Sequence, residues 1–441
     1  MKRALFLSIL TVSAMYWLPG CSSGAYDSIG NPGGEFVGGD GEGAGTSGGF
    51  GDSSGPSSPA GPTDPNGNGS TPGTLTAGDW DDNLNFEIYQ SYLSEYLQTD
   101  QAPFIHSADR IVITVQDATG NGVPNAQVEV AGSAGTFLSI PTATDGHALL
   151  LPTHDGAPQD ENLTVKVLPP PGQDNVAPVT LSLSVSQKEW LIPLPGATRK
   201  LPDALDLAFV IDATGSMDDE LEYLKTEIDG ISSDVKAAFA SVDIRYGLVV
   251  YRDKGDQYVT RKFEFTSDLA EFKTNLNMQV AAGGGDTPEA MDAAMADMMS
   301  LQWRTGNAAR LAFLVADAPT QLDGREPFLA SANEARLAGI KVYPVAASGV
   351  STDAEFQMRN AAQATLGRYL FLTDDSGVGN SHAEPHIPCY QVQHLNKLIN
   401  RMVASELAGE RIPAESGDIL RAVGAPMDGV CTLEDGSKAY L

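Results

Sequence analysis

Apolar residues from position 205 onward follow two alternating patterns. Continuous apolar runs, beginning with residues 205–211, are separated by segments in which apolar residues recur every three or four positions, such as Leu221, Leu224 and Ile228. Continuous runs are typical of strands buried on both faces of a sheet, and the second spacing is typical of amphipathic helices. The alternation predicts an α/β domain over residues 203–410, with a doubly wound, Rossmann-like parallel sheet covered by helices on both faces.

The same runs predict the individual elements of this domain. The predicted strands are residues 205–211, 244–251, 311–316, 340–346 and 369–372, and the predicted helices lie near 221–235, 288–301, 327–337, 353–364 and 390–407. In such a sheet, ligands bind beyond the carboxyl ends of the strands. Functional side chains are therefore expected in the loops that follow the strands.

Residues 105–198 show a period of two instead. Ile111, Ile113 and Val115 alternate with the positions between them, and turn residues such as 120–122 separate one short run from the next. This pattern predicts a small all-β sandwich in front of the α/β domain.

Residues 79–104 carry a short helical pattern. Leu84, Ile88, Tyr92 and Tyr96 lie near helical spacing, which predicts an amphipathic helical segment. We expect this helix to pack on the residues that follow it.

The first 78 residues resemble an export signal followed by a tether. Lys2 and Arg3 precede a short apolar run, so residues 1–20 are expected to be a signal peptide. Residues 21–78 consist mainly of Gly, Ser, Pro, Asn, Thr and acids, a composition that cannot bury enough surface to offset its ordering entropy. They are expected to form a disordered linker, which as a Gly-rich coil would span about 40 Å.

The run Leu18-Pro19-Gly20-Cys21 resembles the bacterial lipoprotein box. The resemblance implies acylation of Cys21 and attachment to a lipid membrane in the cell envelope, whereas the alternative is an ordinary signal peptide with a chance cysteine. If the source is a Gram-negative bacterium, Ser22 favours the outer membrane, with either a periplasmic or a surface-exposed domain.

The net charge argues against one class of partner, and the cysteine count bears on a possible disulfide. The net charge of −30 argues against nucleic acid as a partner, because binding to phosphates requires clustered Lys and Arg. If Cys21 is acylated, Cys389 and Cys431 remain as an even pair in an oxidising compartment, and they form either a disulfide or two buried thiols. A disulfide would join the C-terminal tail, residues 411–441, to the α/β domain.

Three loops of the α/β domain carry chemically active side chains. They contain the run from Asp212 to Ser216 after the first strand, the run 283–289 before a helix, and Asp317 after a later strand. Together they resemble the metal-ion-dependent adhesion site of von Willebrand factor A domains, the fold shared by integrin inserted domains. The resemblance covers about residues 205–407 and implies a defined set of metal ligands: Asp212, Thr214, Ser216, Thr287 and Asp317.

The chemistry of this set predicts the ion and its use. Two carboxylates and three hydroxyls make a hard oxygen site that favours Mg²⁺, with Mn²⁺ or Ca²⁺ as alternatives. Neutral hydroxyls leave the ion electrophilic, so that a carboxylate from a protein partner can bind to it. We therefore expect an adhesion or protein-binding module, with residues 253–256 and 322–326 near the metal setting specificity. The alternative is a structural scaffold in which the metal only stabilises the loops.

Other motifs give weaker predictions. Asp218, Asp219 and Glu220 suggest a second metal site, but acids in the first turn of a helix are favoured by its dipole, and we prefer that reading. Surface histidines are favoured over a zinc site for the irregularly spaced histidines near Cys389: His382, His386 and His394. No hydrolase, metalloprotease or phosphate-loop motif occurs, so an enzyme is not expected.

The predicted sandwich also resembles a known family. The runs 122–128 and 144–148 are similar to carboxypeptidase-regulatory-like or transthyretin-like domains, which often accompany secreted binding modules. The resemblance implies a spacer or auxiliary adhesion module with no catalytic residues.

Overall fold

The computed structural model describes residues 71–158, 162–285, 287–378, 382 and 385–441. The predicted signal peptide, Cys21 and most of the predicted tether lie outside these residues. None of the helices in the described part of the chain is both long and apolar enough to cross a membrane.

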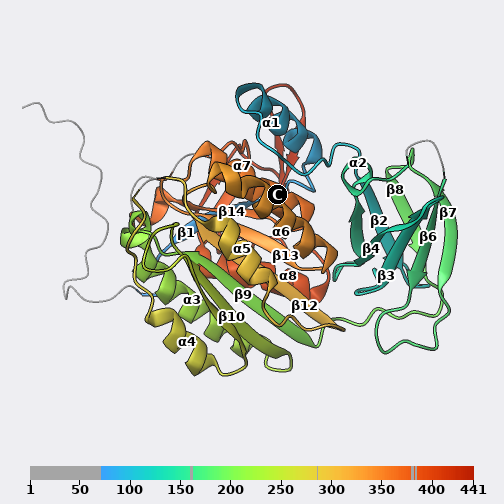
Figure 1. Ribbon diagram of the computed structural model, residues 1–441, viewed down its shortest axis with the longest axis horizontal. Coiled ribbons are helices and arrows are strands. Elements are labelled where there is room, and N and C mark those ends of the chain that lie inside the picture. Colours follow the sequence, from blue (N-terminus) through green and yellow to red (C-terminus); the bar gives the residue numbers. More distant parts are fainter. Residues whose placement is uncertain (1–70, 159–161, 286, 379–381, 383–384) are drawn as a thin grey trace, which may run out of the picture. The chain divides into compact units, whose positions relative to one another are not determined.

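A nine-stranded mixed sheet forms the centre of the α/β domain (Figure 1). Its strands follow one another across the sheet in the order β11 (Thr260–Thr266), β10 (Asp243–Tyr251), β9 (Ala204–Asp212), β12 (Ala308–Ala316), β13 (Lys341–Ala346), β14 (Tyr369–Thr373), β1 (Thr76–Trp80), β15 (Tyr390–His394) and β16 (Arg421–Val423). Strands β10, β9, β12, β13 and β14 are parallel, and the other pairings are antiparallel. The predicted α/β class is confirmed, although antiparallel strands extend the sheet on both sides.

Helices cover both faces of this sheet. One face packs against α3 (Asp218–Ala238), α4 (Leu269–Asn277) and α8 (Leu395–Ala408), and the other against α5 (Met291–Met299), α6 (Arg325–Leu337) and α7 (Thr352–Ala364). Successive residues of β9 enter opposite cores, with Phe209 on the α3 side and Val210 on the α5 side. Burial on both faces explains why β9 is a continuous apolar run.

Strand β1 corrects the predicted boundary between the tether and the helical segment. Residues 76–80 are hydrogen-bonded to β14 on one side and β15 on the other. Small residues are required here, because a Cβ at Gly78 would lie 2.6 Å from the ring of Phe371. The carboxylate of Glu227 fixes the approach to β1 by accepting the backbone N–H groups of residues 73, 74 and 75 at 2.6–3.0 Å.

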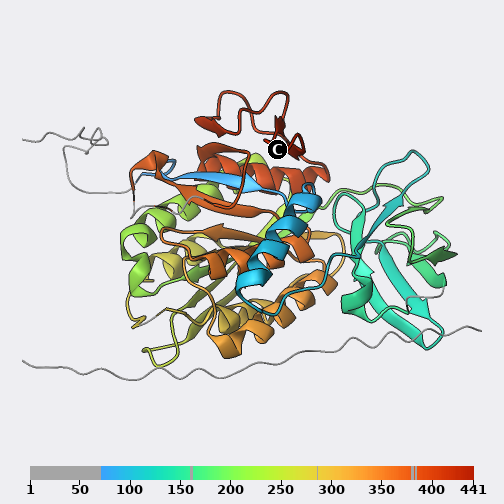
Figure 2. The same ribbon diagram turned by 90° about the horizontal axis from the view of Figure 1, so that it is seen from above.

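Helix α1 (Phe86–Thr99) packs on α7 of the α/β domain and also on Ala102 and Phe104, which directly follow it in the chain (Figure 2). Tyr96 stacks on Phe356 of α7 with ring centroids 3.8 Å apart, and the guanidinium of Arg359 lies over the ring of Tyr92. The predicted helix 390–407 is also corrected, because its first five residues form β15.

Two smaller sheets share a separate apolar core between residues 111 and 197. One contains β2 (Ile111–Gln116), β5 (His147–Leu150) and β8 (Glu189–Pro193), and the other contains β3 (Gln127–Gly132), β4 (Gly135–Pro141), β6 (Asn162–Leu168) and β7 (Val179–Ser184). A short helix, α2 (Pro152–Asp155), follows β5. The buried side chain of Arg336 on α6 joins this sandwich to the α/β domain through Asp155 and the carbonyl oxygen of Leu149.

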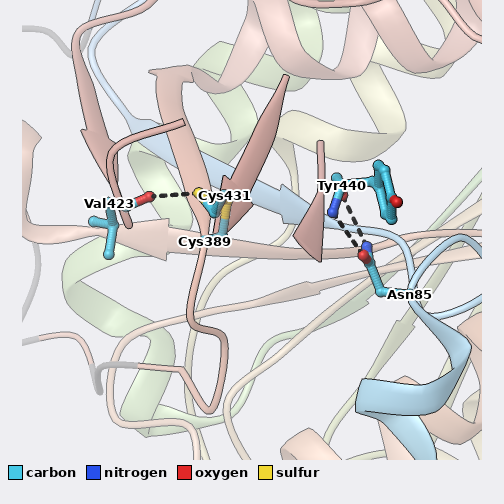
Figure 3. Close-up of a disulfide and its surroundings, with 5 residues drawn as sticks. All are labelled: Asn85, Cys389, Val423, Cys431 and Tyr440. Carbon is cyan, nitrogen blue, oxygen red and sulfur yellow. Dashed lines mark hydrogen bonds between the residues drawn. A yellow bond between two sulfur atoms is a disulfide. The ribbon is translucent and has the colours of Figure 1, made fainter. Parts of the chain in front are cut away.

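The last 30 residues belong to the folded structure rather than to a free tail. Strand β16 extends the central sheet, and β17 (Val430–Thr432) pairs with β18 (Lys438–Tyr440). A disulfide joins Cys389 to Cys431, and Asn85 exchanges two hydrogen bonds with the backbone of Tyr440 (Figure 3). The C-terminal segment is therefore held at two separate points.

We predict that Cys431→Ser destabilises the protein and loosens its C-terminal segment. The disulfide closes a loop of 42 residues, and a loop of this size stabilises a fold by about 2–4 kcal/mol by restricting the unfolded chain. Urea unfolding would measure the loss, and limited proteolysis would locate new cleavage after residue 411. Wild-type protein with reductant is the matched control and should match the variant; equal stability of the oxidised wild type and the variant would contradict the prediction.

Candidate metal site

The first loop of the candidate site begins where the strand order changes direction. Strand β9 lies between β10 and β12, so the loop after Asp212 opens at the crevice where parallel sheets bind ligands. The chain leaves β9 at Asp212, passes through a short 3₁₀ turn (Gly215–Met217) and enters α3. Asp212 and Thr214 are completely buried, whereas Ser216 is exposed.

Asp212, Thr214 and Ser216 are brought into direct contact. Asp212 Oδ1 accepts hydrogen bonds from the backbone N–H of Thr214 at 2.9 Å and from its hydroxyl at 2.7 Å. The hydroxyl of Thr214 lies 3.1 Å from Ser216 Oγ. The second carboxylate oxygen, Asp212 Oδ2, is buried and forms no hydrogen bond of regular geometry among the described residues, although the buried hydroxyl of Tyr251 lies close enough to lower the pKa of Asp212.

The second loop is joined to the first through its backbone. Gly215 donates to the carbonyl oxygen of Gly283 at 3.0 Å, and Ala282 donates to that of Ala213 at 3.0 Å. Thr287 follows in the same loop with an exposed side chain, and within the described part of the chain it hydrogen-bonds to none of the other four predicted ligands. The structure thus places Thr287 on this loop without a direct contact to them.

The third loop brings a second carboxylate close to Asp212. Asp317 follows β12 and is 8% exposed. Burial, together with the neighbouring charge of Asp317, raises the pKa of Asp212 to about 7. The backbone N–H of Glu289 donates to the carbonyl oxygen of Pro319 at 2.9 Å, which joins the second loop to the third.

Glu289 is a further acid at this site that the sequence did not identify as functional. Burial and the charges of Asp212, Asp253 and Asp317 raise its pKa to about 9. A Cβ on Gly284 would lie 2.6 Å from Glu289 Oε1, so the glycine is needed to admit this carboxylate. The available signal was an acid two residues after Thr287, but only the tertiary contacts show that it is buried beside the loop.

The described residues fit a divalent cation. Asp212, Asp317, Glu289 and Asp253 are nearly buried and lie close enough to repel one another. Arg252 is buried nearby, but it donates to the carbonyl oxygens of Ala213 and Val280 and forms no ion pair within the described segments. A bound cation would supply the missing positive charge.

Among the described residues, no three or more His, Cys, Asp or Glu side chains are arranged to hold a metal ion by themselves. Asp212, Thr214, Ser216 and Asp317 instead offer a mixture of carboxylates and hydroxyls. Oxygen donors of this kind suit Mg²⁺ better than zinc.

The two weaker metal predictions receive no support from the contacts. Glu220 accepts the N–H of Ser348 at 3.1 Å and lies 3.0 Å from His382 Nε2, so its carboxylate is already occupied. His382 also contacts Asp374 at 2.8 Å and is buried, so the expectation of a surface histidine is wrong for this residue. His386 pairs separately with Glu355.

Comparison with known proteins identifies the class of the domain. Residues 206–381 match the von Willebrand factor type A domain model. The chain therefore carries a von Willebrand factor type A domain at these positions, as its three loops predicted.

Two curated relatives share part of this chain. The chain is 34% identical over 119 residues to the alpha-protein kinase vwkA of Dictyostelium discoideum, and 34% identical over 88 residues to a putative ariadne-like RING finger protein of Acanthamoeba polyphaga mimivirus. These matches cover 26% and 20% of this chain, but only 19% and 8% of the relatives.

Solved structures with related folds include BatB from Bacteroides thetaiotaomicron, at 12% identity and a TM-score of 0.33, covering 46% of this chain and 99% of that chain. The pilus adhesin SpaC from Lactobacillus rhamnosus GG is matched at 10% identity and a TM-score of 0.31, covering 49% of this chain and 31% of the adhesin.

We predict that Asp212→Asn has opposite effects on the free energy of unfolding in metal-free buffer and in Mg²⁺. Without metal, the substitution removes the repulsion between two buried carboxylates, so the variant should be at least as stable as the wild type. With Mg²⁺ at about 100 times its dissociation constant, the wild type should gain about 2.7 kcal/mol, and the variant should gain much less. Urea unfolding in metal-free buffer and in Mg²⁺ measures both differences; an equal gain in the two proteins would contradict the assignment.

We also predict a pH dependence from His382. Burial lowers the pKa of His382, but hydrogen bonds to Glu220 and Asp374 outweigh this and raise the pKa above its usual value. Because the folded-state pKa is the higher one, this stabilisation is complete below the unfolded-state pKa of about 6.5 and is lost as the pH rises through the folded value.

The test is urea unfolding of the wild type and His382→Asn on both sides of this pH range. The variant should lose stability mainly at the lower pH, by about 1–3 kcal/mol. His386→Asn is the matched control, because the side chain of His386 is 52% exposed and should contribute less. A loss that is the same at both pH values would show that His382 is not held as a cation.

Proposed function

We propose that this protein is a metal-ion-dependent adhesion or protein-binding module that holds an acidic group of a partner through Mg²⁺. The observation that carries the proposal is the buried carboxyl of Asp212 beside the charge of Asp317, which the nearby hydroxyls of Thr214 and Tyr251 do not neutralise. A buried carboxylate in this position is costly unless it is protonated or a cation binds it.

Each predicted ligand has a distinct part in this function. Asp212 and Asp317 would supply the negative charge that retains the ion. Thr214, Ser216 and Thr287 would supply neutral oxygens. The bound ion would act as an electrophile toward a carboxylate of the partner. Because Ser216 and Thr287 are exposed while Asp212 is buried, this arrangement supports a site open to a partner on its hydroxyl side.

Two loops near the site are proposed to set partner specificity. Lys254 in residues 253–256 forms an ion pair with Asp323 in residues 322–326 at 3.0 Å, which links the two loops. Leu322 beside this pair is 77% exposed. An exposed apolar side chain next to charged ones is typical of a protein-binding surface.

We further propose that the module is tethered in the cell envelope by acylated Cys21. The support is the lipoprotein-like run ending at Cys21 and the composition of residues 21–78. In a Gram-negative source, Ser22 would favour the outer membrane.

Partner capture with and without metal distinguishes this function from a scaffold whose metal only stabilises the loops. The immobilised full-length protein should retain an envelope partner in Mg²⁺, release it in EDTA and recover it when Mg²⁺ is restored. Asp212→Asn should reduce capture at least tenfold, whereas Asp234→Asn, which removes an exposed acid from the body of α3, should not. Capture that survives both EDTA and Asp212→Asn would favour the scaffold.

A further inference from the structure

A second recognition site is suggested by a cleft of about 290 Å³ between the sandwich and the α/β domain. Side chains from β2 and β5 face side chains from β13, α8 and the turn after β1. The cleft wall includes four of the 27 basic residues in a strongly acidic chain: Arg110, Lys341, Arg368 and Arg411. Small ligands are often bound where two modules meet around a few convergent polar groups.

Four acids also line the cleft, and three of them have partners: Glu406, Asp81 and Asp145, which contacts His147, whereas Glu410 is exposed. Glu406 accepts from the hydroxyl of Thr144 at 2.9 Å, from Lys341 at 2.7 Å and from the hydroxyl of Tyr343 at 2.9 Å. Asp81 accepts two backbone N–H groups and contacts both Arg368 and Arg411. These carboxylates therefore have little capacity left to satisfy further donors.

Arg110 is the cation that this arrangement leaves without a carboxylate. Its guanidinium donates to the side chain and the backbone carbonyl of Asn83 and lies 3.5 Å from the centre of the Phe86 ring. Across the described ranges it forms no ion pair. Burial lowers the pKa of Arg110 to about 10, and the nearby charge of Asp81 only partly offsets this effect.

We propose that this cleft binds a small organic carboxylate, with Arg110 as its main partner. A guanidinium held in place by Asn83 and Phe86 can donate to a carboxylate with little loss of side-chain freedom. The remaining wall includes apolar side chains that suit a short carbon skeleton better than an inorganic ion: Leu84, Val112, Leu149 and Leu366.

This site is separate from the candidate metal site. None of the five predicted metal ligands lines the cleft, and the cleft residues come from other elements. Carboxylate binding here should therefore persist without metal and in Asp212→Asn. If the candidate metal site did not bind metal, the cleft could still bind a carboxylate. Likewise, absence of carboxylate binding in the cleft would not contradict the metal site.

Calorimetric titration of the full-length protein with succinate in metal-free buffer tests the proposal. We expect saturable binding of succinate but not of succinamide, which has the same skeleton without charge, at constant ionic strength. This comparison needs no variant. Saturable binding of both compounds, or of neither, would overturn the proposal.

Substitutions then locate the site. Arg110→Gln should weaken succinate binding at least tenfold, the size expected for the loss of one charged hydrogen-bonding partner. Arg110→Lys keeps the charge but loses the planar fork, and it should give a smaller loss. Lys236→Gln removes an exposed charge from α3 and should leave binding unchanged. Wild-type affinity in folded Arg110→Gln would show that succinate binds elsewhere.

Discussion

The repulsion between Asp212 and Asp317 constrains the loops at the carboxyl ends of β9 and β12. Parallel strands β9 and β12 lie side by side, so their carboxyl ends bring these two acids together in a place that excludes water. Glu289 and Asp253 bring further carboxyl groups to this cluster, and burial and the neighbouring acids raise the pKa of Glu289 to about 9. Either protons or a bound cation would offset the charge of such a cluster.

Local patterns in the sequence predicted the parts of this arrangement that depend on neighbouring residues. The continuous apolar run of β9 predicted this strand correctly, and Asp212, Thr214 and Ser216 lie in contact in the loop after it, while their role as metal ligands stays a prediction. The von Willebrand factor type A resemblance rested on the same loops, and the family match now covers residues 206–381.

Features that depend on distant contacts escaped prediction. Strand β1 shows no continuous apolar run, and its Gly78 fits against the rings of Phe371 and Tyr390, about 300 positions away. His382 is polar and flanked by polar sequence, yet its contacts with Glu220 and Asp374 hold it in the interior. The burial of Glu289 likewise follows from packing against other loops. In each case the partner that determines the structure lies far along the chain.

The position of β1 also has a mechanical consequence. A force applied on the N-terminal side of residue 71 would act first on the hydrogen bonds to Glu227. It would then act on β1, which is hydrogen-bonded to a strand on each side. An edge strand can be peeled away one bond at a time, but β1 would have to break its bonds to β14 and β15 together. A load applied through the N-terminal side of the domain would therefore meet the resistance of this internal strand.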